Sequence, residues 1–524
     1  MENKENIGEQ IAGVGISTAS MSSYLLIGKL FAFLVAGISL VVVARILGPS
    51  GYGIYVVAIA VAGIAGSVGN FGIGTALTKF ISEYKSKKAN KKIDSVLSNG
   101  IFILAVVGGV FTIVTFLFSG VAALYALHGS QYVYVIQTAS LIIVVSILSG
   151  ALYSALIGFG YGKYSAAYSI FEIVVQSAVS ITLAMLGYGP ISPVIGVIFG
   201  QSAGFAFALY AIYGRGKNGF VMPTAKGIRK LFAFAWPVAA SNFFSSIIND
   251  FSVIFLGIFV ASSIVGNFGL ASRTNFLGDI VVGSIGLAIL PSFTRLFSAK
   301  RTREDIGRFY NMAIYISMVV VSPFMFFLIF FAKPVSYLAF GSSYSLAPLY
   351  IAVAAAGIVI SIFGNYSGTM LISDNRTRDI MRYRMYMFVI QLALMFVLIY
   401  LFGGLGLAIL VFLVGPLLQA FFYIRRIRMV YKIKTNYNKA GRALLSNALS
   451  FFLVWAVLFW LGNNYLYLVP AAIVGIILVY PIVLTMLKGI ERADSKMMKD
   501  LSKNIPIVGK LLFIILSYAE AFMR

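Results

Sequence analysis

Apolar residues run along the chain in stretches of about twenty or more, and short polar segments separate them. A helix needs about 20 apolar residues to cross a bilayer, whereas membrane β-strands give short alternating stretches that this sequence lacks. Helices also satisfy their own backbone hydrogen bonds in lipid. The pattern predicts an all-α integral membrane protein with about fourteen transmembrane helices, at 22–46, 52–80, 95–119, 131–157, 165–187, 190–213, 231–259, 262–294, 308–331, 345–372, 384–402, 405–430, 443–462 and 465–487.

The predicted helices fall into two groups of six and a final pair. At a shift of 213 residues, Gly74–Phe80 lies over Leu287–Phe293 and Gly53–Tyr55 over Gly266–Phe268, which indicates an internal repeat. Two six-helix bundles in parallel pseudo-repeat are therefore expected, arranged around a shared central site. The predicted parts are an N-terminal lead-in at 1–21, bundles at 22–213 and 231–430, a basic linker at 214–230, helices 13 and 14 at 443–487, and a basic tail at 488–524.

Residues 505–523 in that tail are apolar but are interrupted by Pro506 and Lys510. The part from Gly509 to Phe522 is too short to span a bilayer. Two interpretations remain open for it: a helix that lies on the membrane surface, and a tail that packs loosely on the basic loops.

The charged residues are few, and the basic ones lie almost entirely on one side of the predicted membrane spans. Only 11% of the residues are charged, against roughly 25% in soluble domains, and 60% are hydrophobic. Of the 40 basic residues, 36 lie in one set of loops and tails, whereas the opposite loops contain only Lys333. Basic loops stay in the cytoplasm, so the protein is expected to be multi-pass in the cytoplasmic (plasma) membrane with both termini inside. The net charge of +24 is then a signal of orientation and does not indicate nucleic-acid binding.

Several kinds of chemistry are excluded by composition. There is no cysteine, and the one histidine is His128 in a predicted outer loop. Disulfides, thiolate chemistry and Cys- or His-rich metal sites are therefore not expected, and no Ser–His–Asp triad can form. The sequence also contains no P-loop for ATP. We expect a protein that is not an enzyme and has no cofactor, apart from a coupling proton or sodium ion.

Six charged residues stand out at membrane depth, away from the basic ends of the predicted spans. A charge at the centre of a membrane helix costs about 2.5–3.5 kcal/mol, so these side chains should face a cavity or a partner. They are Lys29, Arg45, Glu172, Asp250, Arg273 and Asp279. None of them falls on a charge when the repeat is superposed. Charges that break the symmetry point to a substrate or coupling ion more than to the fold.

Depth along the helices separates their roles. Asp250 and Arg273 both lie about 15 Å from the outer surface, near the midplane, where they could pair as a structural bridge or act in function. Lys29 has no acid in its own span and is interpreted as a cavity cation. Arg45 lies near the outer end and is more simply a boundary anchor. Asn70 and Asn242 could contact substrate or join helices.

The segments Val43–Tyr55 and Phe71–Leu77 resemble the opening of the oligosaccharide/polysaccharide flippases (O-antigen flippase type). These belong to the multidrug/oligosaccharidyl-lipid/polysaccharide exporter superfamily. Trp236–Pro237 and Val265–Ala271 are similar to later landmarks, and the resemblance extends over residues 22–430. It implies fourteen helices in two bundles around a central cavity. It also implies flipping of a polyprenyl-diphosphate-linked (or polyprenyl-phosphate-linked) oligosaccharide by alternating access, for surface polysaccharide or glycoprotein glycan assembly.

The resemblance also suggests roles for individual residues. Lys29 and Arg273 best match the cationic cavity positions, and Asn242 and Asn70 are further candidates for binding substrate. Asp250, Asp279 and Glu172 are candidates for a coupling ion or an ion pair. The family often places an acid closer to the glycine that here is Gly257, where this chain has Ser252. The expected partners are lipid-linked oligosaccharide, membrane lipids and glycan-assembly enzymes.

Three other interpretations stay open. A cation-coupled multidrug exporter of the same superfamily would favour an acidic cavity and twelve spans. An antiporter-like proton-translocating subunit would need a chain of intramembrane Lys, Glu and His, for which only Lys29 and Glu172 qualify. A membrane scaffold without transport would leave the intramembrane charges unexplained.

Overall fold

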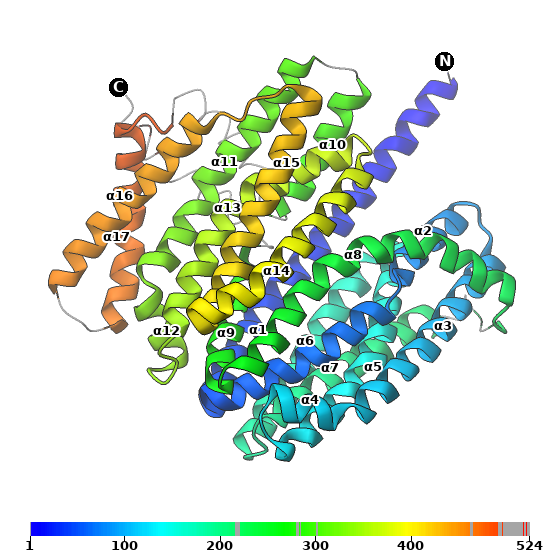
Figure 1. Ribbon diagram of the computed structural model, residues 1–524. Helices are drawn as coiled ribbons and strands as arrows, with labels where there is room; N and C mark the ends of the chain where they lie inside the picture. The colour runs from blue at the N-terminus through cyan, green and yellow to red at the C-terminus, as the bar shows by residue number, and fades with distance from the viewer. Residues whose placement is uncertain are drawn as a thin grey trace. The chain divides into compact units, whose positions relative to one another are not determined.

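A computed structural model shows that the described part of the chain is helical, without a β-strand among the described residues (Figure 1). The structure describes residues 2–214, 221–278, 284–299, 302–461 and 465–490, together with a few single positions. Within them, ten helices are long and apolar enough to cross a membrane. The prediction of an all-α, multi-pass membrane protein is thus confirmed. The count of fourteen and the pseudo-repeat stay predictions, and the two interpretations of 505–523 concern residues outside the described ranges.

The chain forms two compact units, Met1–Gly266 and Asn267–Arg524. The first unit contains the N-terminal elements through α8, and the second begins within α9 (Ser262–Gly278). The elements of the first unit are α1 (Glu2–Gly69), α2 (Ile73–Ser86), α3 (Asn90–Leu117), α4 (Ser119–Ala126), η1 (Ser130–Tyr132), α5 (Val133–Gly158), α6 (Gly162–Met185), α7 (Ile191–Tyr213) and α8 (Ala225–Phe259).

Glycines at positive φ break the helices of the first unit. α1 bends at Gly48, whose φ of 65° favours a residue without a side chain, and this is where the sequence places the turn between the first two spans. The single helix expected over 52–80 is wrong. Phe71 and Gly72 have φ of 42° and 68°, so α1 ends at Gly69 and α2 starts at Ile73, directly after the break.

The start of α8 is fixed to neighbouring helices of the same unit. The backbone N–H of Thr224 donates to Asn99 Oδ1 of α3 at 2.8 Å, and that of Val221 donates to Ser98 Oγ. The ring of Phe234 meets Phe80 of α2 edge to face, with ring centroids 5.5 Å apart. These contacts group α8 with the elements that precede it.

The second unit continues with α10 (Ser284–Ser298), α11 (Arg303–Phe330), α12 (Ala332–Phe340), α13 (Ala347–Ser373), α14 (Thr377–Ile409), η3 (Leu410–Val414), α15 (Gly415–Tyr431), α16 (Tyr437–Leu461) and α17 (Tyr465–Met486). Helices α9 and α10 lie within the single helix expected over 262–294, and most positions between Gly278 and Ser284 lie outside the described residues, so that helix stays a prediction. The turn expected between 384–402 and 405–430 is a kink at Gly403, with φ 56°.

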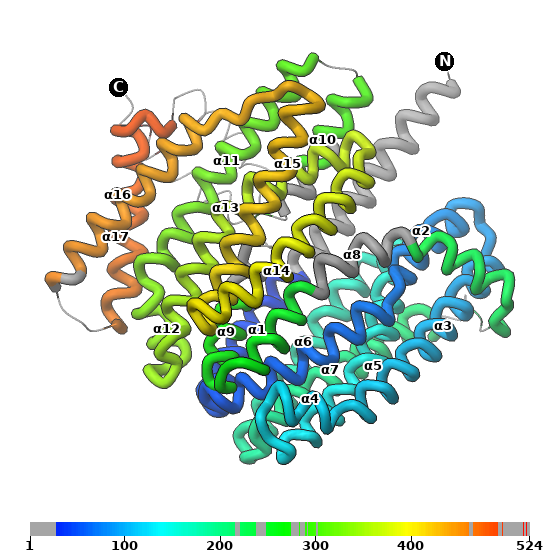
Figure 2. Tube along the Cα trace, in the orientation of Figure 1, coloured from blue at the N-terminus to red at the C-terminus, as the bar shows by residue number. Residues whose placement is uncertain are grey.

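Helix α13 is central to the second unit and packs on α11 and α15, as the trace in Figure 2 also shows. Two buried tyrosine–serine hydrogen bonds join α11 to α13: Tyr310 Oη lies 2.8 Å from Ser367 Oγ, and Ser317 Oγ lies 2.6 Å from Tyr366 Oη. Helix α16 joins α11 through Asn447, whose Nδ2 donates to Ser322 Oγ. Paired hydroxyls of this kind satisfy polar groups that would otherwise be costly in an apolar interior.

Candidate functional site

Glu172 lines a polar cavity of about 340 Å³ inside the first unit. Three membrane-spanning helices, α5, α6 and α7, form its walls. The lining residues are Ser146, Ser149, Gly150, Tyr153, Tyr168, Ser169, Glu172 and Gln201. A carboxyl group, two phenols, three hydroxyls and an amide thus lie together at membrane depth, where ionisable groups mark functional sites.

A chain of hydrogen bonds connects the three helices at this cavity. Tyr168 lies one helical turn before Glu172 on α6, and its Oη lies 2.6 Å from Ser149 Oγ. Ser149 Oγ also donates to the backbone carbonyl of Gln201, at 2.9 Å. Gln201 Oε1 is buried and has no hydrogen-bond partner among the described residues. The cavity therefore offers an unsatisfied acceptor to a water molecule or a cation.

Glycines at every fourth position of α7 let α6 approach closely behind Glu172. A Cβ atom at Gly196 would clash with Ser180 of α6. A Cβ atom at Gly200 would lie 2.8 Å from the carbonyl oxygen of Glu172, and one at Gly204 would lie 2.8 Å from the ring of Tyr168. Small residues spaced by four are a known signal for close packing of membrane helices. This signal is present in the sequence, but the sequence-based prediction did not use it.

We expect Gly200→Ala to destabilise the protein by about 1–3 kcal/mol, the usual cost of overpacking. The added methyl would lie 2.5 Å from Cβ of Gln176 and 2.8 Å from a backbone oxygen, and the backbone cannot move away cheaply. Gly109→Ala on α3 is the matched control, because nothing lies within 4 Å of its added methyl. Thermal unfolding in detergent measures both variants, and equal melting temperatures would contradict the close approach.

Asp250 of α8 lies against α1 in the same unit. Its Oδ2 and Cγ atoms would be 2.8 and 3.0 Å from a Cβ at Gly63, so the glycine provides the space for the carboxyl group. Asp250 is partly buried, and among the described residues it makes no ion pair. The predicted pair with Arg273 stays a prediction, because Arg273 belongs to the second unit.

Lys29 is exposed on α1, next to the point where α1 touches α6. That contact is made at Gly28, where a Cβ would lie 2.9 Å from Cα of Ala166. Among the described residues, Lys29 makes no hydrogen bond and no ion pair. An accessible ammonium group in an apolar helix, without an acid beside it in the described structure, is suited to hold an anion.

The remaining predicted site residues are less fully defined. Asn70 is exposed at the break between α1 and α2, where its carbonyl accepts from the backbone N–H of Ile73. Arg273 is exposed on α9, and Arg45 is exposed on α1 just before the kink. Asp279 and the side chain of Asn242 lie outside the described residues. The structure thus brings Glu172 together with polar partners and Asp250 with Gly63, and it leaves the other roles as predictions.

Sequence comparison identifies one family. The family model described as polysaccharide biosynthesis protein matches residues 19–297, which is more than half of the chain. No curated protein sequence matches.

Solved structures share the fold at low sequence identity. A structure titled lipid II flippase MurJ, in an inward closed conformation, is 16% identical, with a TM-score of 0.73 over 88% of this chain and 98% of that one. An inward-facing multidrug resistance MATE family transporter of the MOP superfamily is 16% identical, with a TM-score of 0.63 over 76% and 94%. A MOP superfamily transporter from Pyrococcus furiosus is 14% identical, with a TM-score of 0.56 over 79% and 95%. These likenesses establish the fold alone.

Proposed function

Because the chain belongs to the polysaccharide biosynthesis protein family, we propose that it flips a lipid-linked oligosaccharide across the cytoplasmic membrane. The proposed substrate is a polyprenyl-diphosphate-linked or polyprenyl-phosphate-linked oligosaccharide, for surface polysaccharide or glycoprotein glycan assembly. The fold shared with a structure titled lipid II flippase over 98% of its length supports transport of a lipid-linked head group. Glycan-assembly enzymes would supply and consume such a substrate and are proposed partners.

The observation that carries this proposal is the accessible ammonium group of Lys29 on a membrane-spanning helix. A phosphate or diphosphate group leaves water only when cations or amide donors replace its hydration. Lysine supplies a point charge, and arginine supplies a planar fork that can hold two oxygens, so Arg273 is the proposed second contact. Asn70 and Asn242 would add amide donors near the head group.

Directional transport by alternating access also needs coupling to an ion gradient. The acidic residues are candidates to bind the coupling ion. Glu172 faces the polar cavity of α5, α6 and α7, where hydroxyl and amide oxygens surround it. Oxygen ligands of this kind suit a proton or a sodium ion. Asp250 and Asp279 are further proposed coupling or ion-pairing residues. In this proposal the basic loops, and with them both termini, lie in the cytoplasm.

The direct test is transport by the purified full-length protein in liposomes. We expect a fluorescent polyprenyl-diphosphate oligosaccharide to become accessible on the far side of the membrane faster than in protein-free liposomes. The measurement is quenching of the fluorophore by a reductant that does not cross the bilayer. A quenched fraction identical with and without the protein would contradict a flippase.

A cation-coupled multidrug exporter is the second candidate, and the fold shared with a MATE transporter favours it. The same liposomes separate the two functions. Uptake of a cationic dye that depends on the protein, with no movement of the lipid-linked sugar, would support the exporter and overturn the flippase.

A further inference from the structure

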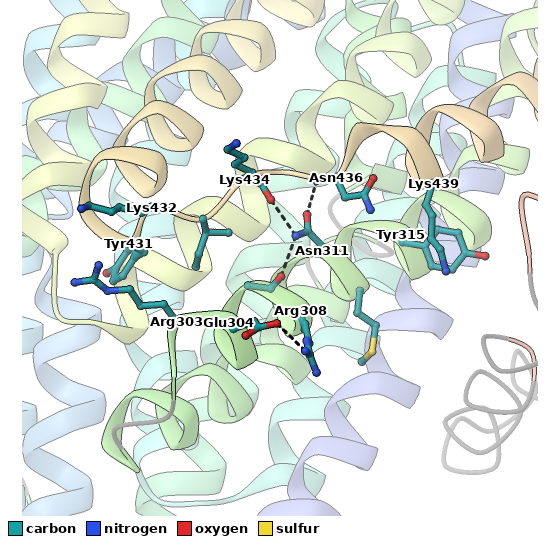
Figure 3. Close-up of a pocket in the computed structure, with 13 residues that line it drawn as sticks. Arg303, Glu304, Arg308, Asn311, Tyr315, Tyr431, Lys432, Lys434, Asn436 and Lys439 are labelled. Carbon is teal, nitrogen blue, oxygen red and sulfur yellow. Dashed lines mark hydrogen bonds and ion pairs between the residues drawn. The ribbon is translucent and has the colours of Figure 1, made fainter.

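The second unit contains a basic pocket that the transport proposal does not use (Figure 3). Its volume is about 560 Å³, within the range of pockets that hold small ligands. The start of α11, the end of α15, the connector to α16 and the first turn of α16 line it. Five of its side chains are cationic and one is acidic: Arg303, Arg308, Lys432, Lys434 and Lys439 against Glu304.

Most of this positive charge is not neutralised within the pocket. The one acid, Glu304, already pairs with Arg308 at 2.7 Å. Arg303, Lys432 and Lys434 are exposed and make no ion pair among the described residues. The pocket is therefore an anion site by charge.

The backbone around the pocket is held in place, which distinguishes it from a loose basic loop. Asn311 of α11 makes two hydrogen bonds to the connector. Its Nδ2 donates to the carbonyl of Lys434 at 3.1 Å, and its Oδ1 accepts from the backbone N–H of Asn436 at 2.7 Å (Figure 3). Ile433 packs on Gly307, where a Cβ would lie 3.3 Å from its side chain. The connector thus presents Lys432 and Lys434 from a fixed position.

The pocket also lies where membrane spans end. One span begins at Arg303, another ends at Tyr431, and a third begins at Tyr437. Its floor contains buried apolar or aromatic groups, Ile433 and Tyr315, and its rim is cationic. This combination fits the boundary between acyl chains and phosphates, and the basic loops place it on the predicted cytoplasmic side.

We propose that this basic pocket binds the phosphodiester head group of an anionic phospholipid of the inner leaflet. Basic pockets between membrane helices on the cytoplasmic side suit such head groups, since the cations meet the phosphate while the acyl chains stay in the bilayer. The site is separate from the transported substrate and does not depend on the flippase proposal.

The test compares lipids on the purified full-length protein in a neutral detergent. Binding of short-chain phosphatidylglycerol is measured by native mass spectrometry and by the rise in melting temperature. We expect Arg303→Gln/Lys434→Gln to weaken phosphatidylglycerol binding by about 30-fold, since each cation at an anionic lipid surface contributes about fivefold. Neither side chain has a partner to lose within the described structure, so folding should be unchanged.

Lys91→Gln/Lys226→Gln is the matched control. It also removes two exposed cations at helix starts on the predicted cytoplasmic side, outside the pocket, and it should bind phosphatidylglycerol as the wild type does. Arg303→Lys/Lys434→Arg should restore binding. Equal weakening by the control, or equal binding of phosphatidylcholine, would overturn the site. Binding of glycerol phosphate as strong as that of the lipid would overturn the lipid as ligand in favour of a soluble phosphate.

Discussion

Replacing Lys29 by alanine is expected to slow flipping of a polyprenyl-diphosphate oligosaccharide about 100-fold. Truncating one partner of a desolvated charge pair costs about 2–5 kcal/mol, and a diphosphate that crosses the membrane interior depends on such contacts. Arg273→Ala should act in the same direction. The quenching assay in liposomes measures the rate, and the melting temperature measures folding.

The melting temperature distinguishes a role of Lys29 in transport from a role in the stability of the fold. Lys29 is exposed and makes no ion pair among the described residues, so its removal should leave the protein as stable as before. Lys29→Arg should keep most of the rate, because the charge stays at the same depth. Lys333→Ala is the control, since Lys333 is an exposed lysine at the start of α12, in a predicted outer connection. A normal rate with lower stability in Lys29→Ala would show a structural role and contradict the cavity cation.

Hydropathy predicts the membrane helices well where a turn carries a clear chemical signal. The glycines at Gly48 and Gly403 were placed at turns from the sequence, and both have positive φ in the structure. The break at Phe71–Gly72 was missed because the residues around it are as apolar as a span. The apolar content of a segment indicates that lipid surrounds it, whereas a helix break depends on the backbone angles. The positive φ of Phe71, 42°, cannot be predicted from its residue type.

For the site, ionisable residues could be predicted, but their surroundings could not. Glu172 and Asp250 were selected because a charge at membrane depth is costly. Their neighbours Tyr168, Ser149 and Gly63 belong to residue types that are common in membrane helices, so composition gave no reason to choose them. The basic pocket could not be predicted for another reason. In the sequence, Lys434 is one of many basic loop residues that indicate orientation, and its position beside α11 depends on the fold.

Glu172 lines its cavity beside hydrogen bonds that join three helices, and we expect its protonation to affect them. Each hydroxyl has one hydrogen to donate. When Ser149 donates to the carbonyl of Gln201, the Tyr168 hydroxyl must donate to Ser149, and a hydrogen bond from Glu172 to Tyr168 would then require a protonated carboxyl group. We expect an ionised Glu172 to accept a hydrogen bond from the Tyr168 hydroxyl, and Ser149 would then donate to Tyr168 instead of to Gln201. In this hypothesis, loss of one proton removes the hydrogen bond between Ser149 of α5 and Gln201 of α7.

Glu172→Gln is accordingly expected to abolish the acceleration of flipping by a proton gradient while some flipping continues without one. The amide cannot lose a proton at this site, so the network stays in the arrangement of the protonated acid. The measurement is the ratio of the rate with an imposed pH gradient to the rate without it, which should fall to about one; a sodium gradient is tested separately. Tyr168→Phe should give an intermediate ratio, because it removes the hydroxyl that bonds Ser149 but leaves the acid.

Glu83→Gln on α2 is the control for loss of a carboxylate. Its side chain pairs with Lys87 at 2.7 Å on the surface, and the variant should respond to the gradient as the wild type does. A Glu172→Gln protein that keeps the full response would exclude Glu172 as the coupling group and leave Asp250 and Asp279 as the acids to test. If the sodium response alone disappears, the cavity binds sodium, and Gln201 Oε1, which lacks a partner among the described residues, is then the expected additional ligand.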